Sequence, residues 1–372
     1  MSTFVKTVES YVPGARTMGR EYYTSPDIFA VEMVRIFSSR WLCVGREEQI
    51  ARPGEFFVQE VGAESIIILR DRSGVARAFF NVCRHRGTRI CEASEGQFSE
   101  TIQCPYHAWT YATDGRLVGA PHMNEAEGFD KRNYSLHAAA VAAWHGFLFI
   151  NLSKDPEPLE DALAPLRGRF ERFHLAALTR VRRIDYEVKA NWKLIFQNYS
   201  ECLHCPTIHP ELSRLMPYTS GANDLVEGPY LGGHMLIAPP NKSMTMNGEA
   251  CGVPLGDLSA EDMQRAYYYT IFPNLMLSVH PDYVAYYRVW PLAADRTRVT
   301  CEWLIHTDSA MHPELSAEGA VEFWDVTNRQ DWHISELSQA GIASRVYTPG
   351  PYSPRESIPA AWDRAYLEAL GE

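Results

Sequence analysis

The chain has 372 residues, of which 46% are hydrophobic, and it carries a formal net charge of −11 at pH 7. This size allows a large core in two domains or one elaborate domain, and the acidic balance argues against nucleic-acid binding, because phosphates attract basic surfaces. The start, MSTFVKTVES, lacks the pattern of a secretory signal, and the most apolar run, residues 138–150, is too short to span a bilayer. We therefore expect a soluble cytoplasmic protein, with no membrane partner, whose eight cysteines stay reduced.

The predicted elements change in type along the chain. Residues 1–40 form a helical segment packed on the second domain, in which Ser25 or Asp27 could cap an amphipathic helix. Residues 41–155 hold short β-type runs such as FFVQEV and SIIILR between Gly, Asp and Ser turns, which predicts a small all-β domain. Residues 156–372 alternate strands with helical stretches at about 157–175, 191–205, 259–268 and 317–340. The predicted fold class is therefore α+β.

Two short motifs in the predicted β domain each pair a cysteine with a histidine. They are Cys83-Arg84-His85 and Cys104-Pro-Tyr-His107. In an extended segment Cys83 and His85 point to the same side, because side chains alternate with period two. Cys104 and His107 are separated by a Pro-Tyr turn and can aim both ligands at a second point nearby. Zinc is one interpretation, but a zinc finger usually takes its cysteines from one knuckle and its histidines from a helix. One cysteine and one histidine from each loop instead suit a [2Fe-2S] cluster with two thiolates on one iron and two imidazoles on the other.

A second pair of histidines lies in the segment ANWKLIFQNYSECLHCPTIHPEL, residues 190–212. His204 and His209 are five residues apart, about 140° around an ideal helix, so a regular helix would not aim both at one metal. Pro206 should kink or end the helix just after His204, and His209 can then turn back. Two imidazoles and one carboxylate, with open positions, form the facial triad of non-haem Fe(II) oxygenases.

The carboxylate of such a triad must come from elsewhere, and the late helical stretch 317–340 offers Glu322, Asp325, Asp331 and Glu336. Asp325 and Asp331 each stand at an inward position relative to a tryptophan, so periodicity alone leaves the choice between them open.

A C-x-x-C pair, Cys202 and Cys205, supports a different interpretation of the same region. It could be a redox dithiol or half of a zinc site. However, no second pair follows it, and no thioredoxin-like βαβ pattern surrounds it.

The string CRHRG, followed by CPYHAW, resembles the Rieske motif of the Rieske non-haem iron oxygenases. The resemblance runs over roughly residues 20 to 355. It implies a Rieske [2Fe-2S] domain at 41–155 and a helix-grip-like catalytic domain at 156–372, in which helices cover an antiparallel sheet. It also implies that Cys83 and Cys104 hold one iron, whereas His85 and His107 hold the other.

The resemblance extends to the mononuclear iron and to the segment before His204. The family's late helix carries its ligand aspartate where FWD stands here, which selects Asp325 as the partner of His204 and His209 on Fe(2+). Most members place Asp three residues before the first histidine, whereas this chain has Glu201. In having this longer carboxylate, the chain resembles the subgroup of the family that oxidises choline, glycine betaine, carnitine and proline betaine. The resemblance further implies a head-to-tail homotrimer, in which Glu201 links a neighbour's cluster histidine, preferably His107, to His204.

Aromatic segments at 267–270 and 282–291 are candidates for the substrate pocket. Aromatic faces attract a trimethylammonium group through cation–π interaction, although aromatic residues also fill strands for packing alone. The candidate substrate-contacting residues are Asn198, Tyr267, Tyr283, Tyr287 and His234.

The sequence shows no G-x-G-x-x-G motif after a strand and no plant-type ferredoxin motif, so a separate NAD(P)H-dependent reductase should supply electrons. We expect a terminal oxygenase that uses O2 to hydroxylate or N-demethylate a small quaternary ammonium substrate. Two alternatives remain: a Rieske oxygenase acting on an aromatic or heteroaromatic substrate, because an aromatic pocket also stacks on rings, and a Rieske electron-transfer protein without oxygenase activity.

Overall fold

The structure of the chain, a computed structural model, describes residues 11–372, so the start of the chain, where a secretory signal was sought, lies outside the described residues. The chain divides into two compact units, one of residues 37–164 and one that joins the segment up to residue 36 to residues 165–372. Within residues 11–372, no helix is both long and apolar enough to cross a membrane.

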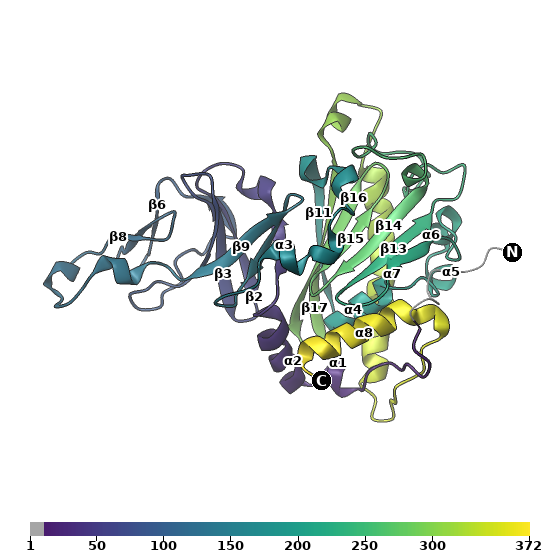
Figure 1. Cartoon of the computed structure of the whole chain (residues 1–372), viewed down its shortest axis with the longest axis horizontal. Helices are drawn as coiled ribbons and strands as arrows, with labels where there is room; N and C mark the ends of the chain where they lie inside the picture. Colours follow the sequence, from purple (N-terminus) through teal and green to yellow (C-terminus); the bar gives the residue numbers. More distant parts are fainter. Residues whose placement is uncertain (1–10) are drawn as a thin grey trace. The chain divides into compact units, whose positions relative to one another are not determined.

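The unit of residues 37–164 consists mainly of β-strands (Figure 1). One sheet has seven strands in the order β1-β10-β9-β4-β3-β2-β5, and a smaller sheet has the order β6-β7-β8. The strands are β1 (Leu42–Arg46), β2 (Glu55–Val61), β3 (Glu64–Arg70), β4 (Ala76–Phe80), β5 (Glu95–Gln97), β6 (Thr101–Gln103), β7 (Thr110–Ala112), β8 (Leu117–Gly119), β9 (Ala138–Trp144) and β10 (Phe147–Asn151), and one short helix, α3 (Leu159–Ala162), follows them. The runs FFVQEV and SIIILR form β2 and β3, as predicted.

A single antiparallel sheet forms the centre of the other unit, in the order β11-β17-β16-β15-β14-β13-β12. Its strands are β11 (Leu178–Val188), β12 (Ala222–Leu225), β13 (Tyr230–Leu236), β14 (Arg265–Ile271), β15 (Leu275–Val279), β16 (Val284–Ala293) and β17 (Arg296–His306). Residues 284–291 of β16 are all buried, because β15 and β17 pair with both of its edges and both of its faces are covered. The prediction of a β domain followed by an antiparallel sheet with covering helices is confirmed.

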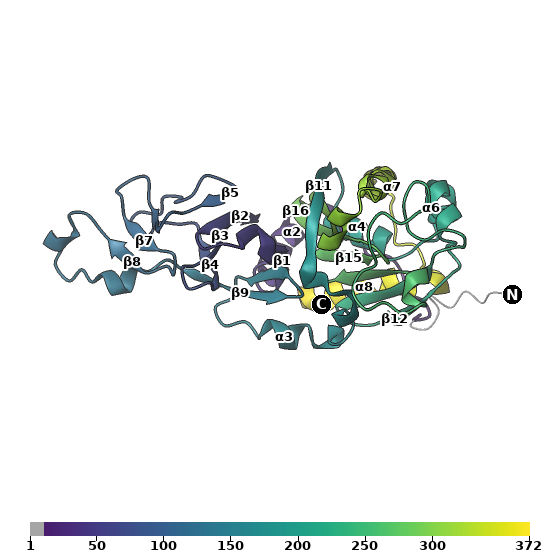
Figure 2. The same ribbon diagram turned by 90° about the horizontal axis from the view of Figure 1, so that it is seen from above.

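The helices of this unit are α1 (Glu21–Thr24), α2 (Pro26–Glu32), α4 (Trp192–Tyr199), α5 (Cys205–Ile208), α6 (Pro210–Leu215), α7 (Glu318–Ile342) and α8 (Ser357–Leu370). Of these, α4, α7 and α8 contact the sheet (Figures 1 and 2). Helix α4 contacts both α7 and α8, and the ring of Phe196 stacks on Trp362 of α8 at 5.3 Å. Ser25 caps α2 by accepting a hydrogen bond from the backbone N–H of Ile28, one of the two caps that the sequence suggested.

Three predicted helical stretches are wrong in extent or type. The stretch at about 157–175 contains only the short helix α3 and separate 3-10 turns. The helix expected at 191–205 ends at Tyr199, and the chain forms a turn before α5 begins at Cys205. The stretch expected to be helical at 259–268 instead enters β14 at Arg265. Its aromatic residues pair with β13 and β15 on both sides, and this cross-strand pairing outweighs the local helical pattern.

Candidate functional site

The two Cys/His motifs lie on loops of the β-rich unit, one after β4 and the other between β6 and β7. The two loops have matching backbone hydrogen bonds. The N–H of Gly87 donates to the carbonyl of Cys83 at 2.9 Å, and the N–H of Ala108 donates to the carbonyl of Cys104 at 3.1 Å. The fourth residue after each cysteine has a positive φ, 74° at Gly87 and 55° at Ala108, which sharply reverses the chain. Each loop therefore reverses the chain in the same way after its cysteine, although the histidine follows two residues after Cys83 and three after Cys104.

The four side chains of these loops gather in one place. The rings of His85 and His107 lie 4.7 Å apart, whereas both cysteines are buried, with 3% of Cys83 and 2% of Cys104 exposed. The ring of Trp109 stacks on His85 at 4.8 Å. Nδ1 of His85 is buried without a hydrogen-bond partner among the described residues, and a metal ion bound there would satisfy it. Two buried sulfurs beside two outer imidazoles fit a Rieske cluster.

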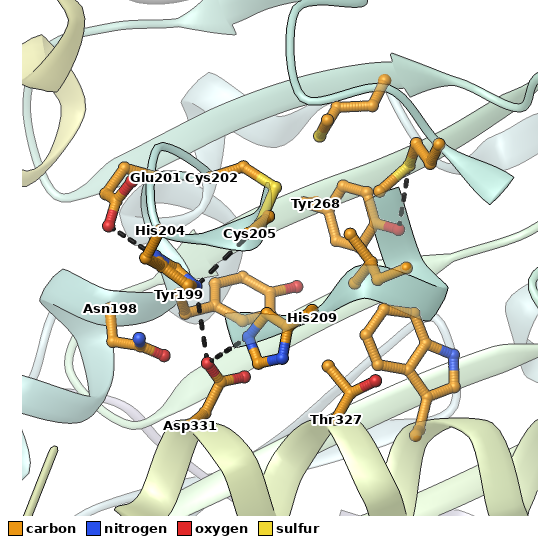
Figure 3. A pocket seen from close by; sticks show the side chains of 14 residues that line it. Asn198, Tyr199, Glu201, Cys202, His204, Cys205, His209, Tyr268, Thr327 and Asp331 are labelled. Atoms are coloured by element: carbon orange, nitrogen blue, oxygen red, sulfur yellow. Dashed lines mark hydrogen bonds and ion pairs between the residues drawn. A yellow bond between two sulfur atoms is a disulfide. The ribbon is translucent and has the colours of Figure 1, made fainter. Parts of the chain in front are cut away.

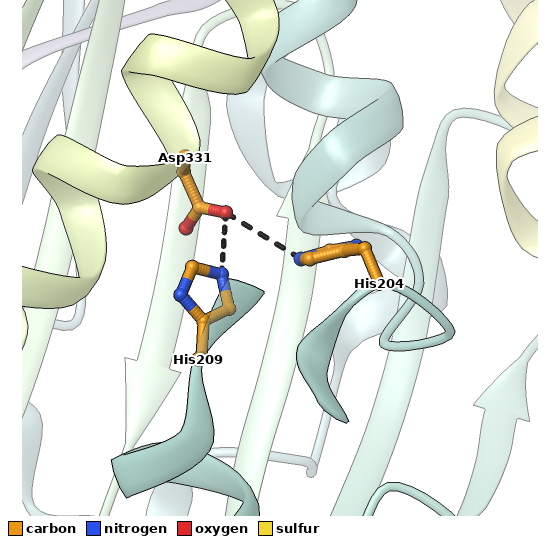
Figure 4. A group of neighbouring side chains, drawn as sticks. All are labelled: His204, His209 and Asp331. Carbon is orange, nitrogen blue, oxygen red and sulfur yellow. Dashed lines mark hydrogen bonds and ion pairs between the residues drawn. The ribbon is translucent and has the colours of Figure 1, made fainter. Parts of the chain in front are cut away.

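A second group of metal-binding side chains lies in the other unit and consists of His204, His209 and Asp331 (Figure 4). One potential ligand atom from each residue lies within 4.8 Å of the other two. Oδ1 of Asp331 is 2.8 Å from Nε2 of His209 and 3.4 Å from Nε2 of His204. His204 ends the turn after α4, and His209 lies between α5 and α6. The two histidines converge because α4 ends at Tyr199, well before Pro206, and not because Pro206 kinks it as predicted.

The remaining ring nitrogens of both histidines are held by hydrogen bonds. Nδ1 of His204 donates to Oε1 of Glu201 at 2.6 Å, and Nδ1 of His209 donates to Oε1 of Gln330 at 2.7 Å. With both Nδ1 protons engaged, each Nε2 is available as a ligand, the arrangement that orients histidines at metal sites. The expected contact between Glu201 and His204 is therefore present, and Gln330 is a positioning residue that the sequence did not reveal.

Charge in this group favours a cation at its centre. Burial alone would lower the pKa of His204, but the hydrogen bonds to Asp331 and Glu201 outweigh burial and raise this pKa from 6.5 to about 10. Burial would raise the pKa of Asp331, but the two histidines outweigh it and hold this pKa below 3.8. Two imidazoles and one carboxylate that together stabilise positive charge suit a divalent metal ion with open positions.

The choice of Asp325 as the third ligand is wrong in the structure. Asp325 lies six residues before Asp331 on α7, about 120° away around the helix axis, so the two carboxylates cannot point at the same place. Asp325 accepts a hydrogen bond from the hydroxyl of Tyr186 at 2.7 Å and another from Nε of Arg329 at 3.0 Å. Periodicity had left Asp331 open, and the tertiary structure selects it.

An open cavity, with about 460 Å³ of empty space when the solvent at its mouth is included, adjoins the three metal-binding side chains (Figure 3). Residues Trp324, Thr327 and Asp331, spaced three and four apart on α7, line one side of it. The full lining consists of Asn198, Tyr199, Glu201, Cys202, His204, Cys205, His209, Leu212, Met216, Met235, Tyr268, Trp324, Thr327 and Asp331.

Of the predicted substrate contacts, only Asn198 lines this cavity. His234 and Tyr267 are opposite one another across β13 and β14, and the hydroxyl of Tyr267 donates to Asp262 at 2.6 Å. Tyr283 donates its hydroxyl to the carbonyl of Met244 at 2.6 Å and is buried behind Trp324. Tyr287 is also buried, 6.0 Å from Tyr199 between ring centres.

The lining includes Tyr268, next to the predicted Tyr267. Adjacent strand residues face opposite sides of a sheet, so an error of one position selects the wrong face. The aromatic segment was therefore the right signal, but only the pairing of β14 with its neighbours shows which of its tyrosines faces the cavity.

The prediction that all eight cysteines stay reduced is also wrong in the structure. Cys202 and Cys205 form a disulfide, whereas the other six cysteines are free and buried. The pair closes because a tight turn brings the two residues together at the start of α5.

Two protein families match the chain: "Ring hydroxylating alpha subunit (catalytic domain)" at residues 175–372 and "Rieske [2Fe-2S] domain" at residues 40–135. The glycine betaine monooxygenase oxygenase subunit of Chromohalobacter salexigens is 33% identical over 369 residues, which cover 91% of this chain and 82% of that protein. The carnitine monooxygenase oxygenase subunit of Acinetobacter baumannii is 39% identical over 201 residues, 53% of each chain. A solved quaternary ammonium Rieske monooxygenase, described for carnitine oxidation and inter-subunit electron transfer, matches with a TM-score of 0.82 and 26% identity over 96% of each chain.

Proposed function

The chain belongs to the family of Rieske oxygenases with a ring-hydroxylating catalytic domain, and from this premise we propose that it oxidises a small quaternary ammonium compound. As a Rieske-type monooxygenase, it is the oxygenase subunit of a system in which a separate reductase supplies electrons. Its cofactors are a Rieske [2Fe-2S] cluster and a mononuclear iron. The proposed reaction is hydroxylation or N-demethylation of the substrate.

Each cofactor has a set of residues that fits it. The proposed cluster ligands are Cys83, His85, Cys104 and His107, and the proposed iron ligands are His204, His209 and Asp331. When bound, the iron supplies O2 activation, with electrons delivered from the cluster. The protein contributes the orientation of both histidines through Glu201 and Gln330.

The aromatic wall of the cavity is the observation that carries the substrate assignment. Tyr268 and Trp324 both line the cavity, with 6.3 Å between their ring centres. Met216 and Met235 add polarisable thioethers to the lining, which contains no lysine or arginine. Rings and soft apolar groups contact N-methyl groups well, and each ring face attracts the positive charge that these groups surround. A neutral ring would gain stacking on the same wall but no attraction of charge.

Electron delivery involves Glu201 and a second copy of the chain in our proposal. The carboxylate of Glu201 is bonded to His204 and is only partly buried, with 15% of its side chain exposed. His107 is also partly exposed at the surface of its own unit. We infer that Glu201 accepts a hydrogen bond from His107 of a neighbouring subunit in a head-to-tail homotrimer, and that an NAD(P)H-dependent reductase reduces the cluster.

The test compares substrates of the same shape with and without the quaternary ammonium charge. Iron-loaded protein and a reductase are offered simple aromatic compounds and also glycine betaine, choline and carnitine, each beside its tert-butyl isostere, which is neutral at that centre, while O2 uptake and products are measured. At least one quaternary ammonium compound should be oxidised, and its tert-butyl isostere should be turned over at least about tenfold less efficiently, which corresponds to the ~1.4 kcal/mol of a partly desolvated cation–π contact.

A matched pair of variants tests the aromatic wall. Tyr268→Leu should raise the KM for the ammonium substrate several-fold, whereas Tyr268→Phe, which keeps the ring face, should change it little. Oxidation of the aromatic compounds alone would support the alternative substrate class. Cluster reoxidation without any oxidised product would favour an electron-transfer protein and refute the proposal.

A further inference from the structure

The disulfide between Cys202 and Cys205 belongs to the wall of the metal-binding cavity (Figure 3). The loop that it closes contains His204, and Glu201, which bonds to His204, directly precedes it. Oε2 of Glu201 also accepts a hydrogen bond from the backbone N–H of Leu203 inside the loop. The disulfide therefore fixes the segment that presents a proposed iron ligand and its orienting carboxylate.

One of the two sulfurs lies beside the ligand atom of His204. Sγ of Cys205 is 3.9 Å from Nε2 of His204, the nitrogen that also faces Asp331. A nitrogen and a sulfur that share one tetrahedral metal lie about 3.6 Å apart, given metal–nitrogen and metal–sulfur bonds of about 2.1 and 2.3 Å. Only a few tenths of an ångström separate the observed distance from that value. A sulfur held in a disulfide does not act as a thiolate ligand, whereas a free cysteine at this position would.

We propose that Cys202 and Cys205 form a reversible dithiol–disulfide pair, and that the reduced form supplies Cys205 as a fourth protein ligand that closes the metal site. The inference rests on the metal site of the proposed function and adds the control of that site. In the disulfide form three protein ligands leave positions open for O2, as in catalytic centres. In the dithiol form two imidazoles, one carboxylate and one thiolate make a closed set of four, which is typical of structural zinc.

The two sulfurs differ in exposure to solvent, and thiol–disulfide exchange requires that at least one of them be accessible. Cys202 is partly exposed, whereas only 3% of Cys205 is exposed, so an external reagent meets Cys202 first. Reduction by a phosphine breaks the S–S bond, consumes one water and yields two thiols and one phosphine oxide. Oxidation by hydrogen peroxide forms the S–S bond again, and the two thiol protons leave in two molecules of water. When Cys205 binds a metal, its thiol proton passes to solvent.

Cobalt(II) is a suitable probe, because a cobalt–thiolate bond gives a charge-transfer absorption in the near ultraviolet. Protein that contains the Rieske cluster is reduced with a phosphine or oxidised with peroxide, freed of reagent and titrated with cobalt(II) under anaerobic conditions. Difference spectra remove the absorption of the cluster, and alkylation with mass spectrometry reports the state of the two cysteines.

We expect the sulfur band in reduced wild-type protein and in Cys202→Ala, where Cys205 is always free. The band should be missing in oxidised wild-type protein and in Cys205→Ala. Cys251 is a buried free cysteine elsewhere in the unit, and Cys251→Ala should respond like wild type. Zinc should bind the reduced form at least about tenfold more tightly than the oxidised form, since even partners outside the ligand set change metal affinity by roughly 10–100-fold.

Three outcomes separate the possible failures. Stoichiometric cobalt binding without a sulfur band in any redox state would overturn the fourth ligand and leave the proposed metal site intact. Failure of oxidised wild-type protein to bind cobalt would contradict the metal site itself. A pair that stays fully alkylatable after peroxide treatment would overturn the reversible disulfide. The redox series on wild-type protein decides the question even where a cysteine variant fails to fold.

Discussion

Replacement of Asp331 by alanine tests the assignment of the iron ligands most directly, because the same helix offers a matched control. Oδ1 of Asp331 lies 2.8 Å and 3.4 Å from the two histidine nitrogens, so Asp331→Ala removes one of three converging ligand atoms. Asp325→Ala removes a carboxylate that bonds only to Tyr186 and Arg329 among the described residues. Both variants lose one negative charge from α7, so their difference reports position and not charge.

The expected size of the effect follows from ligand count. Changes in partners that only support metal ligands cost roughly 10–100-fold in affinity. Loss of a ligand itself should therefore weaken iron(II) binding at least about 100-fold, which is about 2.8 kcal/mol. Asp325→Ala should stay within about threefold of wild type, as is usual for a change away from the site.

Anaerobic competition with a colorimetric iron(II) chelator measures both affinities. The visible absorption of the Rieske cluster serves as an internal control, since its proposed ligands belong to the other unit and neither substitution changes one of them. Loss of iron by Asp325→Ala, with retention by Asp331→Ala, would show that our reasoning from the geometry is wrong.

Three further predictions concern the cluster, electron delivery and pH. Cys83→Ser should abolish the visible absorption of the cluster while the mononuclear site still binds iron(II), as absorption spectra and metal analysis of the purified variant will show. Glu201→Gln, loaded with saturating iron(II), should hold both metals but slow reoxidation of a pre-reduced cluster by roughly 10–100-fold in single turnover, and a wild-type rate would exclude Glu201 as the bridge. Burial raises the pKa of Asp363 from 3.8 to about 7, against the hydrogen bonds from Gln197 and Tyr352. Its contribution to stability is thus fully present below pH 3.8 and lost as the pH rises through about 7. Above that pH, Asp363→Asn should therefore raise the free energy of unfolding by at most about 4 kcal/mol, which is measured as a higher Tm. An unchanged pH profile of Tm would contradict the assignment of this pH dependence to Asp363.

Local sequence was informative wherever ligands are close together in the chain. The two Cys/His motifs each lie within four residues, so their spacing alone indicated one ligand pair per loop, and the structure brings both pairs together. His204 and His209 were likewise recognisable as a pair, although the helix ends at Tyr199 and not at Pro206. The C-x-x-C pair was visible too, but the expected reduced state of its cysteines was wrong.

What the sequence determined by itself is therefore the family, the two cofactors and the loops that carry most of their ligands, because short motifs place those residues within reach of each other in any fold. The tertiary structure decided which of two helical carboxylates joins the histidines and which tyrosine of YYYT faces the cavity. Both decisions depend on the rotation of α7 about its axis and on the register of β14 against its neighbours. Rotation and register are set by packing between segments far apart in sequence, which local periodicity cannot report.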